Sequence, residues 1–383
     1  MELRILMVID SLGPGGAERS LAESLPYLLN EGITPTIVCG YQRLHGVESE
    51  VRSLGVDVRL LTSRTMPARV LELRRIIGSL QPDLIHTVLF ESSILGRLSG
   101  IGTGVPVLTS LVNTTYVPIR RRDPNVRPWK LYVARFVDGW TARHLTTHFH
   151  AITHAVKDAE VEGLGIPAEK VTVIERGRDA ARFGETSLLR RQRARSRLGI
   201  SDDDPIVVSV GRQEFQKGQE YLIRAMDEIA DERVLLLIAG RTGSATAHLQ
   251  QLIHEMGLAD RVRLLGHRDD VPELLAAADV FAFPSLYEGL GGALIEAMSM
   301  GLPIVATDLP AIREVTEAGR CASLVPAGNA SSLATAIEAL LLDEEKRIRF
   351  GEAGQKIFAR RFTLERSVHR MTELYRSLAE QES

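Results

Sequence analysis

The stretch MVIDSLGPGGAERS, Met7–Ser20, joins a short apolar run to a glycine-rich loop and then to the start of a helical pattern. The glycines Gly13, Gly15 and Gly16 let the backbone approach a ligand, and a helix that begins there presents unpaired N–H groups and partial positive charge. In an open parallel sheet, ligands bind beyond the carboxyl ends of the strands. The stretch therefore predicts a strand, a phosphate-binding loop and a helix, while a plain tight turn explains this segment alone equally well.

The same order of apolar run and helical pattern recurs along all 383 residues. Continuous apolar strands joined by helices predict parallel sheets that are covered on both faces. Because the pattern restarts after the polar segment 175–187, we expect two doubly wound α/β domains, over 1–180 and 188–362, and a last helix over 363–383 without a following strand. The expected strands are 3–9, 36–39, 56–61, 84–86, 105–108, 149–152, 206–210, 234–239, 262–264, 280–283 and 304–306.

The composition is that of an ordinary globular protein and narrows the class of function. A formal net charge of -3 argues against a nucleic-acid-binding protein. The two cysteines, Cys39 and Cys321, provide neither a disulfide framework nor a metal-binding spacing, which is typical of a reducing compartment. The beginning of the sequence has no basic leader, and no apolar run approaches the ~20 residues that span a bilayer. We expect a cytoplasmic protein, with peripheral attachment to the inner face of a membrane left open.

The loop at the first strand does not match the dinucleotide-binding fingerprint. That fingerprint requires a third glycine where Glu18 stands, and an acidic residue at the end of the second strand, where the sequence reads TIVCGYQR (36–43). The sequence therefore argues against a dehydrogenase.

Two cations follow the first strand of the second half, in SVGRQEFQKGQEYLI (209–223). Arg212 and Lys217 are five residues apart around a turn, beside a helix start near Gly218. Two cations and a helix N-terminus at one place stabilise a leaving diphosphate. Solvated surface charges are the simpler reading of either residue alone, because Lys and Arg are mostly exposed.

A pair of carboxylates lies further on, in FPSLYEGLGGALIEAMSMG (283–301). We expect Glu288 in the loop after the strand 280–283 and Glu296 about two turns into the next helix. Gly289, Gly291 and Gly292 begin that helix, so its N–H groups can bind a phosphate oxygen. Each carboxylate accepts two hydroxyl hydrogen bonds, as sugars and riboses require. The alternative is a solvated Glu288 and a Glu296 paired with a local cation.

Together these motifs resemble glycosyltransferase family 4, the retaining enzymes of GT-B fold. The matching elements are GGAE at 15–18, GRQEFQKG at 211–218, and LAAADVFAFPSLYEGLGGALIEAMSMGLPIVATD at 275–308, which contains the Glu-x7-Glu pattern Glu288–Glu296. The resemblance spans nearly the whole chain, and its second half is highly specific.

The resemblance implies roles for the charged residues and for several backbone groups. Arg212 and Lys217 would hold the donor diphosphate, Glu288 would bind hydroxyls of the donor sugar, and Glu296 would bind the ribose. It also implies that the first domain binds the acceptor and the second the donor, that the last helix crosses back onto the first domain, and that no metal or other cofactor is required. The backbone groups implied in donor binding are Gly16 from the opposite domain, Gly266 and His267 at the base, and Leu290, Gly291 and Gly292 at the phosphate.

The sequence departs from the family pattern in three places, two in the first half and one in the second. Many relatives carry a histidine after the strand that corresponds to PVLTSL, where Val112 and Asn113 stand here. An Asn-Gly loop is replaced by Arg176–Gly177, and a frequent Gly-Gly pair by Pro310–Ala311. These changes resemble the branch that builds capsular polysaccharides and exopolysaccharides, and they leave no catalytic histidine assigned.

One segment of the first half, 119–144, is basic and rich in aromatic residues. It has seven Lys and Arg residues against two Asp, a net charge of +5. From Trp129 onward, the residues Tyr132, Val133, Phe136 and Trp140 fall on one face of a helix. This pattern predicts either contact with a membrane surface or a lipid-linked acceptor, or a helix whose aromatic face packs on the core.

We therefore expect a retaining, metal-independent glycosyltransferase of the hexosyltransferase type. It would move a sugar from a nucleotide-diphosphate sugar to a glycan, lipid-linked or small-molecule acceptor in polysaccharide or glycoconjugate biosynthesis, with no nucleic-acid partner. A non-catalytic sugar-nucleotide-binding protein and a GT-B nucleotide-sugar epimerase are the alternatives. A phosphorylase is disfavoured, because no lysine in a pyridoxal-phosphate context is recognisable.

Overall fold

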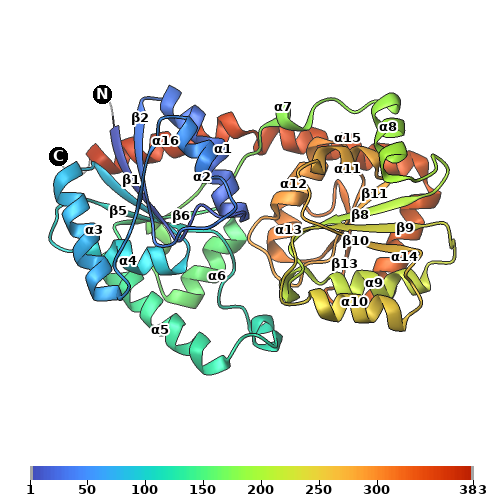
Figure 1. Cartoon of the computed structure of the whole chain (residues 1–383), viewed down its shortest axis with the longest axis horizontal. Coiled ribbons are helices and arrows are strands. Elements are labelled where there is room, and N and C mark those ends of the chain that lie inside the picture. Colours follow the sequence, from blue (N-terminus) through green and yellow to red (C-terminus); the bar gives the residue numbers. More distant parts are fainter. Residues whose placement is uncertain (1–2, 381–383) are drawn as a thin grey trace. The chain divides into compact units, whose positions relative to one another are not determined.

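The computed structural model describes residues 3–380 and divides them into two units, each built on a parallel sheet (Figure 1). Unit 1 comprises residues 3–117, 127–178 and 362–380, and unit 2 comprises 118–126 and 179–361. The chain passes from unit 1 to unit 2 after Arg178, inside the polar segment 175–187. The first unit thus differs from the predicted continuous span 1–180, because residues 118–126 belong to unit 2.

Unit 1 contains a seven-stranded sheet within the described residues, with strand order β3-β2-β1-β4-β5-β6-β7. Its strands are β1 (Leu3–Ile9), β2 (Ile33–Cys39), β3 (Asp57–Leu60), β4 (Leu84–Val88), β5 (Val107–Leu111), β6 (His148–Ala151) and β7 (Val171–Val173). Its helices are α1 (Gly16–Asn30), α2 (Glu48–Ser53), α3 (Met66–Leu80), α4 (Phe90–Gly100), α5 (Pro128–Leu145), α6 (His154–Leu164), the 3-10 turn η2 (Ala168–Lys170) and α16 (Leu364–Glu380).

The alternation of side chains along β1 creates the two cores of unit 1. Met7 and its neighbours two residues away pack with Leu25 of α1 and Val368 of α16, whereas Leu6 and Val8 pack with α3 and α4 on the opposite face. In Figure 1, α1 and α16 accordingly lie on one side of this sheet and α3 and α4 on the other. Each fully buried aliphatic side chain contributes about 1.5–3 kcal/mol.

Unit 2 contains a six-stranded sheet within the described residues, with order β10-β9-β8-β11-β12-β13. Its strands are β8 (Ile206–Val210), β9 (Leu235–Ala239), β10 (Val262–Gly266), β11 (Val280–Phe283), β12 (Ile304–Thr307) and β13 (Ala322–Val325). Its helices are η1 (Pro118–Arg122), α7 (Ala180–Phe183), α8 (Leu188–Leu198), η3 (Phe215–Lys217), α9 (Gln219–Glu228), α10 (Thr246–Glu255), α11 (Val271–Ala277), α12 (Gly292–Ser299), α13 (Pro310–Val315), α14 (Ala330–Leu342) and α15 (Glu344–Arg361).

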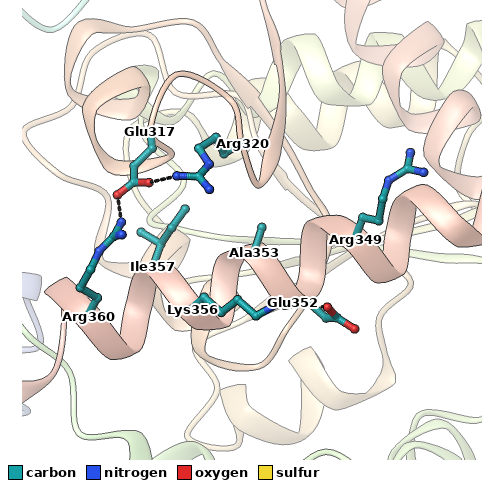
Figure 2. Close-up of a pocket in the computed structure, with 8 residues that line it drawn as sticks. All are labelled: Glu317, Arg320, Arg349, Glu352, Ala353, Lys356, Ile357 and Arg360. Carbon is teal, nitrogen blue, oxygen red and sulfur yellow. Dashed lines mark hydrogen bonds and ion pairs between the residues drawn. The ribbon is translucent and has the colours of Figure 1, made fainter.

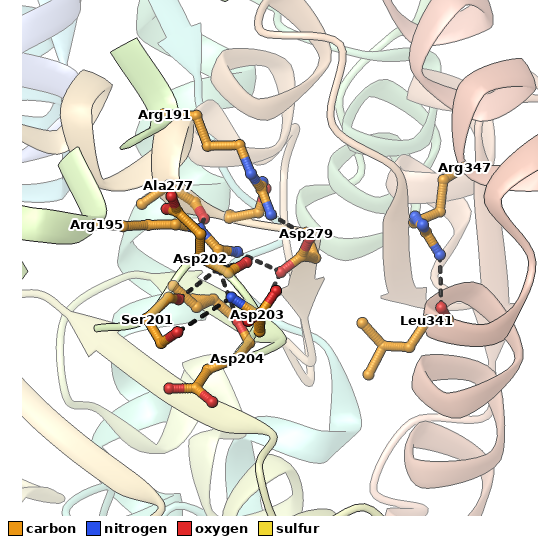
Figure 3. Close-up of polar contacts among 12 residues, drawn as sticks. Arg191, Arg195, Ser201, Asp202, Asp203, Asp204, Ala277, Asp279, Leu341 and Arg347 are labelled. Atoms are coloured by element: carbon orange, nitrogen blue, oxygen red, sulfur yellow. Dashed lines mark hydrogen bonds and ion pairs between the residues drawn. The ribbon is translucent and has the colours of Figure 1, made fainter. Parts of the chain in front are cut away.

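A buried arginine fixes the start of β8 to its surroundings (Figure 3). Arg195 of α8 is fully buried and donates to the carbonyls of Ala277, Ser201, Asp202 and Asp204, and to the Asp279 carboxylate at 2.7 Å. Burial lowers the pKa of its guanidinium, and the Asp279 carboxylate opposes that shift. The backbone of the turn at residues 201–204 is therefore tied to α8.

Besides the excursion of residues 118–126, the chain leaves unit 1 after Arg178 and returns to it at Phe362, and these two places are adjacent. The Arg178 amide donates to the Phe362 carbonyl at 2.9 Å, and the Leu364 amide donates to the Arg178 carbonyl at 3.1 Å. After this crossing, α16 buries Leu364, Val368 and Tyr375 in the core of unit 1. The last helix therefore completes the core of the unit with which the chain begins.

Among residues 3–380, no helix is both long enough and apolar enough to span a lipid bilayer.

Candidate functional site

In unit 2 the strand order reverses between β8 and β11, which pair in parallel with Val208 opposite Phe281. At such a point the loops that follow the two strands diverge to opposite faces and leave a place for a ligand beyond the carboxyl ends. The loop after β8 carries Arg212 and Lys217, and the loop after β11 carries Glu288. The structure thus brings these predicted residues to the switch point of one sheet.

Lys217 and Glu288 form an ion pair between these two loops, with the Lys217 ammonium bonded to Oε1 of Glu288. The Ser285 hydroxyl donates to the same oxygen at 3.1 Å, and the ammonium also lies 5.4 Å from the centre of the Phe283 ring. Glu288 is only 8% exposed, so its charge requires this compensation. The two side chains that sequence analysis assigned to different parts of the donor are therefore partners in the structure.

The backbone of the two loops explains how the pair is held. Gly218 has a φ of +58°, and a Cβ there would lie 2.2 Å from the Pro284 carbonyl oxygen, so the chains pass closely where only glycine is accommodated. The Leu286 amide donates to the Gln216 carbonyl at 2.8 Å, and the Gln216 side-chain amide donates to the Tyr287 carbonyl at 3.0 Å. These bonds connect the two loops independently of the ion pair.

The helix α12 begins directly after the glycine-rich loop. Gly291 has a φ of +87° and precedes the first helical residue, Gly292, whose N–H has no intrahelical acceptor. Leu290 and Gly291 are buried, and Glu296 is half-buried one turn into α12 rather than the predicted two turns. The helix begins later than expected because residues 284–291 form a buried loop. Its N-terminus is available to an anion near Glu288.

Arg212 and the predicted base-binding residues lie at two other strand ends. Arg212 is exposed and makes no ion pair with any carboxylate of residues 3–380. Gly266 ends β10, two strands from β8, and the exposed His267 lies 3.3 Å from the Asp269 carboxylate. These three residues share the carboxyl-end edge of the sheet with the Lys217–Glu288 pair, and no direct bond joins them to it.

Unit 1 has a corresponding switch point between β1 and β4, and Gly16 begins α1 there. Asp10, at the end of β1, accepts from the Ser92 amide at 2.9 Å and the Ser92 hydroxyl at 2.6 Å. Burial raises the pKa of Asp10, and the two bonds from Ser92 oppose that rise. The loop after β1 is thereby tied to α4. The role of Gly16 in donor binding stays a prediction from the resemblance.

A chain of buried side chains runs behind this switch point. Tyr375 Oη lies 2.7 Å from His86 Nδ1, His86 Nε2 lies 2.7 Å from Ser110 Oγ, and Ser110 Oγ lies 2.8 Å from His150 Nδ1. His150 Nε2 lies 2.8 Å from the Ile174 carbonyl. A carbonyl only accepts, so with neutral imidazoles every hydrogen points from Tyr375 toward Ile174.

Burial accounts for the neutrality of the two histidines. Burial, with smaller effects of His150 and Arg176, lowers the pKa of His86 to about 3. Burial also lowers the pKa of His150 to about 4, although the bond to Ile174 opposes the shift. His86 is thus a structural histidine, with both ring nitrogens bonded within the protein.

A pocket of about 220 Å³ lies elsewhere in unit 2, along α15 (Figure 2). Glu317 accepts there from Arg320 at 3.1 Å and from Arg360. The other lining residues are Arg349, Glu352, Ala353, Lys356 and Ile357, and none of the predicted site residues lines the pocket. Its ion pairs connect the turn after α13 to α15, which is a structural role.

Sequence reasoning did not single out the residues that support the ion pair. Ser285, Gln216 and Tyr287 supply bonds to Glu288 or between the loops. Burial raises the pKa of Tyr287. A signal for Ser285 was present in the motif at 283–301. Ser285 stands three residues before Glu288, in a segment without the regular period of a helix or a strand. Within residues 3–380, no cluster of three or more His, Cys, Asp and Glu side chains has a metal-binding arrangement.

The chain matches two family models that together cover both halves. Residues 14–182 match "Glycosyltransferase Family 4", and residues 190–357 match "Glycosyl transferases group 1". D-inositol 3-phosphate glycosyltransferase of Corynebacterium jeikeium is 30% identical over 312 residues, which cover 77% of this chain and 72% of that protein. Alpha-D-kanosaminyltransferase of Streptomyces kanamyceticus is 29% identical over 284 residues, covering 72% and 71%. The chain therefore belongs to glycosyltransferase family 4 and is a glycosyltransferase.

Solved structures agree with the fold. Anabaena HepE, in complex with UDP and glucose, matches with a TM-score of 0.86 and 23% identity over 98% of this chain and 100% of that chain. Sucrose-phosphate synthase of Thermosynechococcus elongatus also has a TM-score of 0.86, with 20% identity over 99% and 100%. The predicted GT-B fold class is confirmed.

Proposed function

We propose that this glycosyltransferase uses a nucleotide-diphosphate sugar and binds its diphosphate at the β8–β11 switch point of unit 2. The Lys217–Glu288 pair carries the proposal, because it places a cation and a carboxylate together where two strand ends diverge. The exposed Arg212 and the N-terminus of α12 add positive potential at the same edge. HepE, which was solved with UDP-glucose, supports a nucleotide sugar as the donor class.

Cleavage of the anomeric bond leaves negative charge on the departing diphosphate. Glu288, which also accepts a hydrogen bond from Ser285, holds the Lys217 ammonium in place before any substrate binds. The positive charge therefore needs little reorganisation when the diphosphate leaves. Arg212 has no carboxylate partner among the described residues and is therefore available for bidentate phosphate binding. We assign charge stabilisation to these two cations, with no metal needed for that step.

Glu288 has a second role in this proposal. Its Oε1 accepts from Lys217 and Ser285, and a carboxylate has further lone pairs for sugar hydroxyls. Glu296, one turn into α12, is assigned to the ribose, and the Gly266–His267 backbone to the base. Transfer with retention to a glycan, lipid-linked or small-molecule acceptor, in the manner of polysaccharide-building relatives, follows the family resemblance.

Substitution Glu288→Gln tests the proposal. Turnover, measured as nucleoside diphosphate released from a panel of UDP-sugars in the presence of acceptor, should fall by about 10²–10³-fold. Thermal stabilisation by UDP alone should be retained, because the cations remain. The matched control Glu345→Gln changes an exposed carboxylate at the start of α15 and should leave turnover unchanged. Near-normal turnover of Glu288→Gln would refute the assigned site.

A further inference from the structure

The helix α5 of unit 1 is folded with its polar side inward and its aromatic side outward. A helix on the surface of a globular protein ordinarily directs its apolar stripe to the core. In α5 the buried residues are Asp138, Gly139, Thr141 and Ala142. The segment that the sequence marked as aromatic and basic therefore does not pack its aromatic face on the core, and that alternative is wrong.

The inward side of α5 is held by a buried arginine. Arg97 of α4 is 1% exposed and donates to the Asp138 carboxylate at 2.6 Å and to the Thr141 hydroxyl at 3.1 Å. The Tyr116 hydroxyl donates to the second Asp138 oxygen at 2.8 Å. Removing this carboxylate from Arg97 would leave a buried charge unpaired, so the orientation of α5 about its axis is strongly fixed.

The outward side of α5 is a continuous aromatic stripe. Its side chains recur at helical spacing and are exposed to these extents: Trp129 62%, Tyr132 74%, Val133 49%, Phe136 64%, Val137 38% and Trp140 47%. Single exposed apolar residues are ordinary, but a contiguous exposed stripe marks an interaction surface. In Figure 1, α5 lies at the outer edge of unit 1. We call these six residues the α5 stripe.

Basic side chains flank the α5 stripe. Lys130 lies 5.7 Å from the centre of the Trp129 ring, and Arg135 and Arg143 are exposed while donating to the Gly163 and Leu164 carbonyls. A carbonyl acceptor does not neutralise a guanidinium. The sole acid of the helix, Asp138, is buried against Arg97, so the exposed side of α5 carries positive charge without an acid.

We propose that the α5 stripe binds the surface of an anionic lipid bilayer. Tyr and Trp rings are suited to the headgroup region, because one end of each is apolar and the other polar, and flanking Lys and Arg are attracted to anionic lipids. The proposal concerns where the enzyme works and does not depend on the donor site in unit 2. It favours the membrane-surface alternative of the sequence reading.

A second copy of the chain is the competing occupant. A two-fold interface would place the same surface on itself, so Lys130, Arg135 and Arg143 would meet like charges of the other copy. An anionic bilayer instead supplies the complementary charge along the whole helix. The charge pattern therefore favours lipid.

The sequence contains a natural probe of this proposal. Its two tryptophans, Trp129 and Trp140, both lie on the α5 stripe. Vesicles of phosphatidylcholine with about one-third phosphatidylglycerol should therefore shift the tryptophan emission of the full chain to the blue, and brominated lipid should quench it. Partition measured by co-sedimentation should be about tenfold stronger than with phosphatidylcholine alone and should weaken as salt is raised.

A double substitution, Tyr132→Ser with Phe136→Ser, keeps both tryptophans and should reduce partition by at least about tenfold. The matched control Leu342→Ser removes an 88% exposed leucine of α14 in unit 2 and should partition like the parent. Equal partition into neutral and anionic vesicles, or an unshifted tryptophan spectrum, would overturn the proposal. A concentration-dependent dimer without lipid that the double substitution abolishes would overturn it in favour of a second copy.

Discussion

The two units have the same strand order over their first six strands, yet they bury different chemistry where that order reverses. At the switch point of unit 2 a charged pair, Lys217 and Glu288, joins the loops after β8 and β11. Behind the switch point of unit 1 a neutral chain runs from Tyr375 through His86 and Ser110 to His150. Topology therefore places the ligand edge in both units, but the side chains decide whether charge or neutral hydrogen bonding occupies it.

The difference separates a site from a support. The charged pair of unit 2 lies with exposed Arg212 and a helix N-terminus, which are groups that attract a phosphate. The histidine chain of unit 1 has each nitrogen bonded within the protein and connects β4, β5 and β6 to α16. Unit 1 thus commits its buried polar groups to its own fold.

Removing the Lys217 ammonium should have the largest effect on turnover and on the free energy of unfolding. Lys217→Met should lower turnover by about 10²–10³-fold, because a positioned charge that stabilises the leaving group is lost. It should also lower the free energy of unfolding by about 3–5 kcal/mol, since Glu288 stays buried without its partner. Nucleoside diphosphate release and urea unfolding measure the two effects.

Two further variants separate stability from catalysis at this pair. Lys217→Met combined with Glu288→Gln should recover most of the lost stability, because no unpaired charge remains, and should stay inactive. Lys356→Met breaks an exposed pair with Glu352 and should change neither property. A fully active Lys217→Met would show that the pair is structural, as the histidine chain of unit 1 is.

Acid should destabilise unit 1 before unit 2. The folded pKa values of His86 and His150, about 3 and about 4, lie below the ordinary value near 6.5, so the unfolded state binds more protons as pH falls through this window. The stability that the two neutral histidines contribute is fully present above pH ~6.5. Below that pH, the free energy of unfolding falls by about 1.4 kcal/mol per pH unit for each histidine. The raised pKa of Asp10 acts in the opposite sense and offsets part of this loss.

Amide hydrogen exchange, corrected for intrinsic rates, distinguishes the two units. Between pH 7 and pH ~5.5, protection should fall in β4 and β6 and stay nearly constant in β8 and β11. The histidines of unit 2, His248, His254 and His267, are exposed. Equal loss of protection in both sheets would contradict the assignment of acid sensitivity to the buried chain.

A smaller effect is expected when the Tyr375 hydroxyl, the first donor of the buried hydrogen-bond chain, is removed. Tyr375→Phe leaves His86 Nδ1 buried without a donor, so the free energy of unfolding should fall by about 1–3 kcal/mol. Tyr132→Phe removes a hydroxyl from a 74% exposed tyrosine and should have almost no effect. Thermal unfolding at pH 7 measures both. Indistinguishable midpoints would mean that the hydroxyl contributes no net stability.

Long apolar runs made the centres of both sheets predictable. Leu3–Ile9, Ile206–Val210 and Val280–Phe283 are strands with the predicted bounds, because most of their side chains are apolar and buried. The edge strands β7 and β13 were missed. They are three and four residues long and include Thr172 and Ser323, so they show no apolar run that distinguishes a strand from a loop.

The residues of the candidate site were predictable, but their partnership was not. Glycine-rich loops after strands indicated Lys217 and Glu288 separately, whereas their ion pair requires that β8 lies beside β11, which no local pattern specifies. The same holds for α5. Helical spacing identified its aromatic face, but the inward side was set by Arg97, which is distant in sequence from Asp138.

The return of the chain at Phe362 has a consequence for biosynthesis. Leu364, Val368, Tyr375 and Leu378 are translated after residues 179–361 of unit 2, and they fill a core whose members outside α16 are translated before those residues. Unit 2 can therefore fold during translation, whereas part of the hydrophobic core of unit 1 remains exposed until α16 has been synthesised. The half that is synthesised first is the half that is finished last.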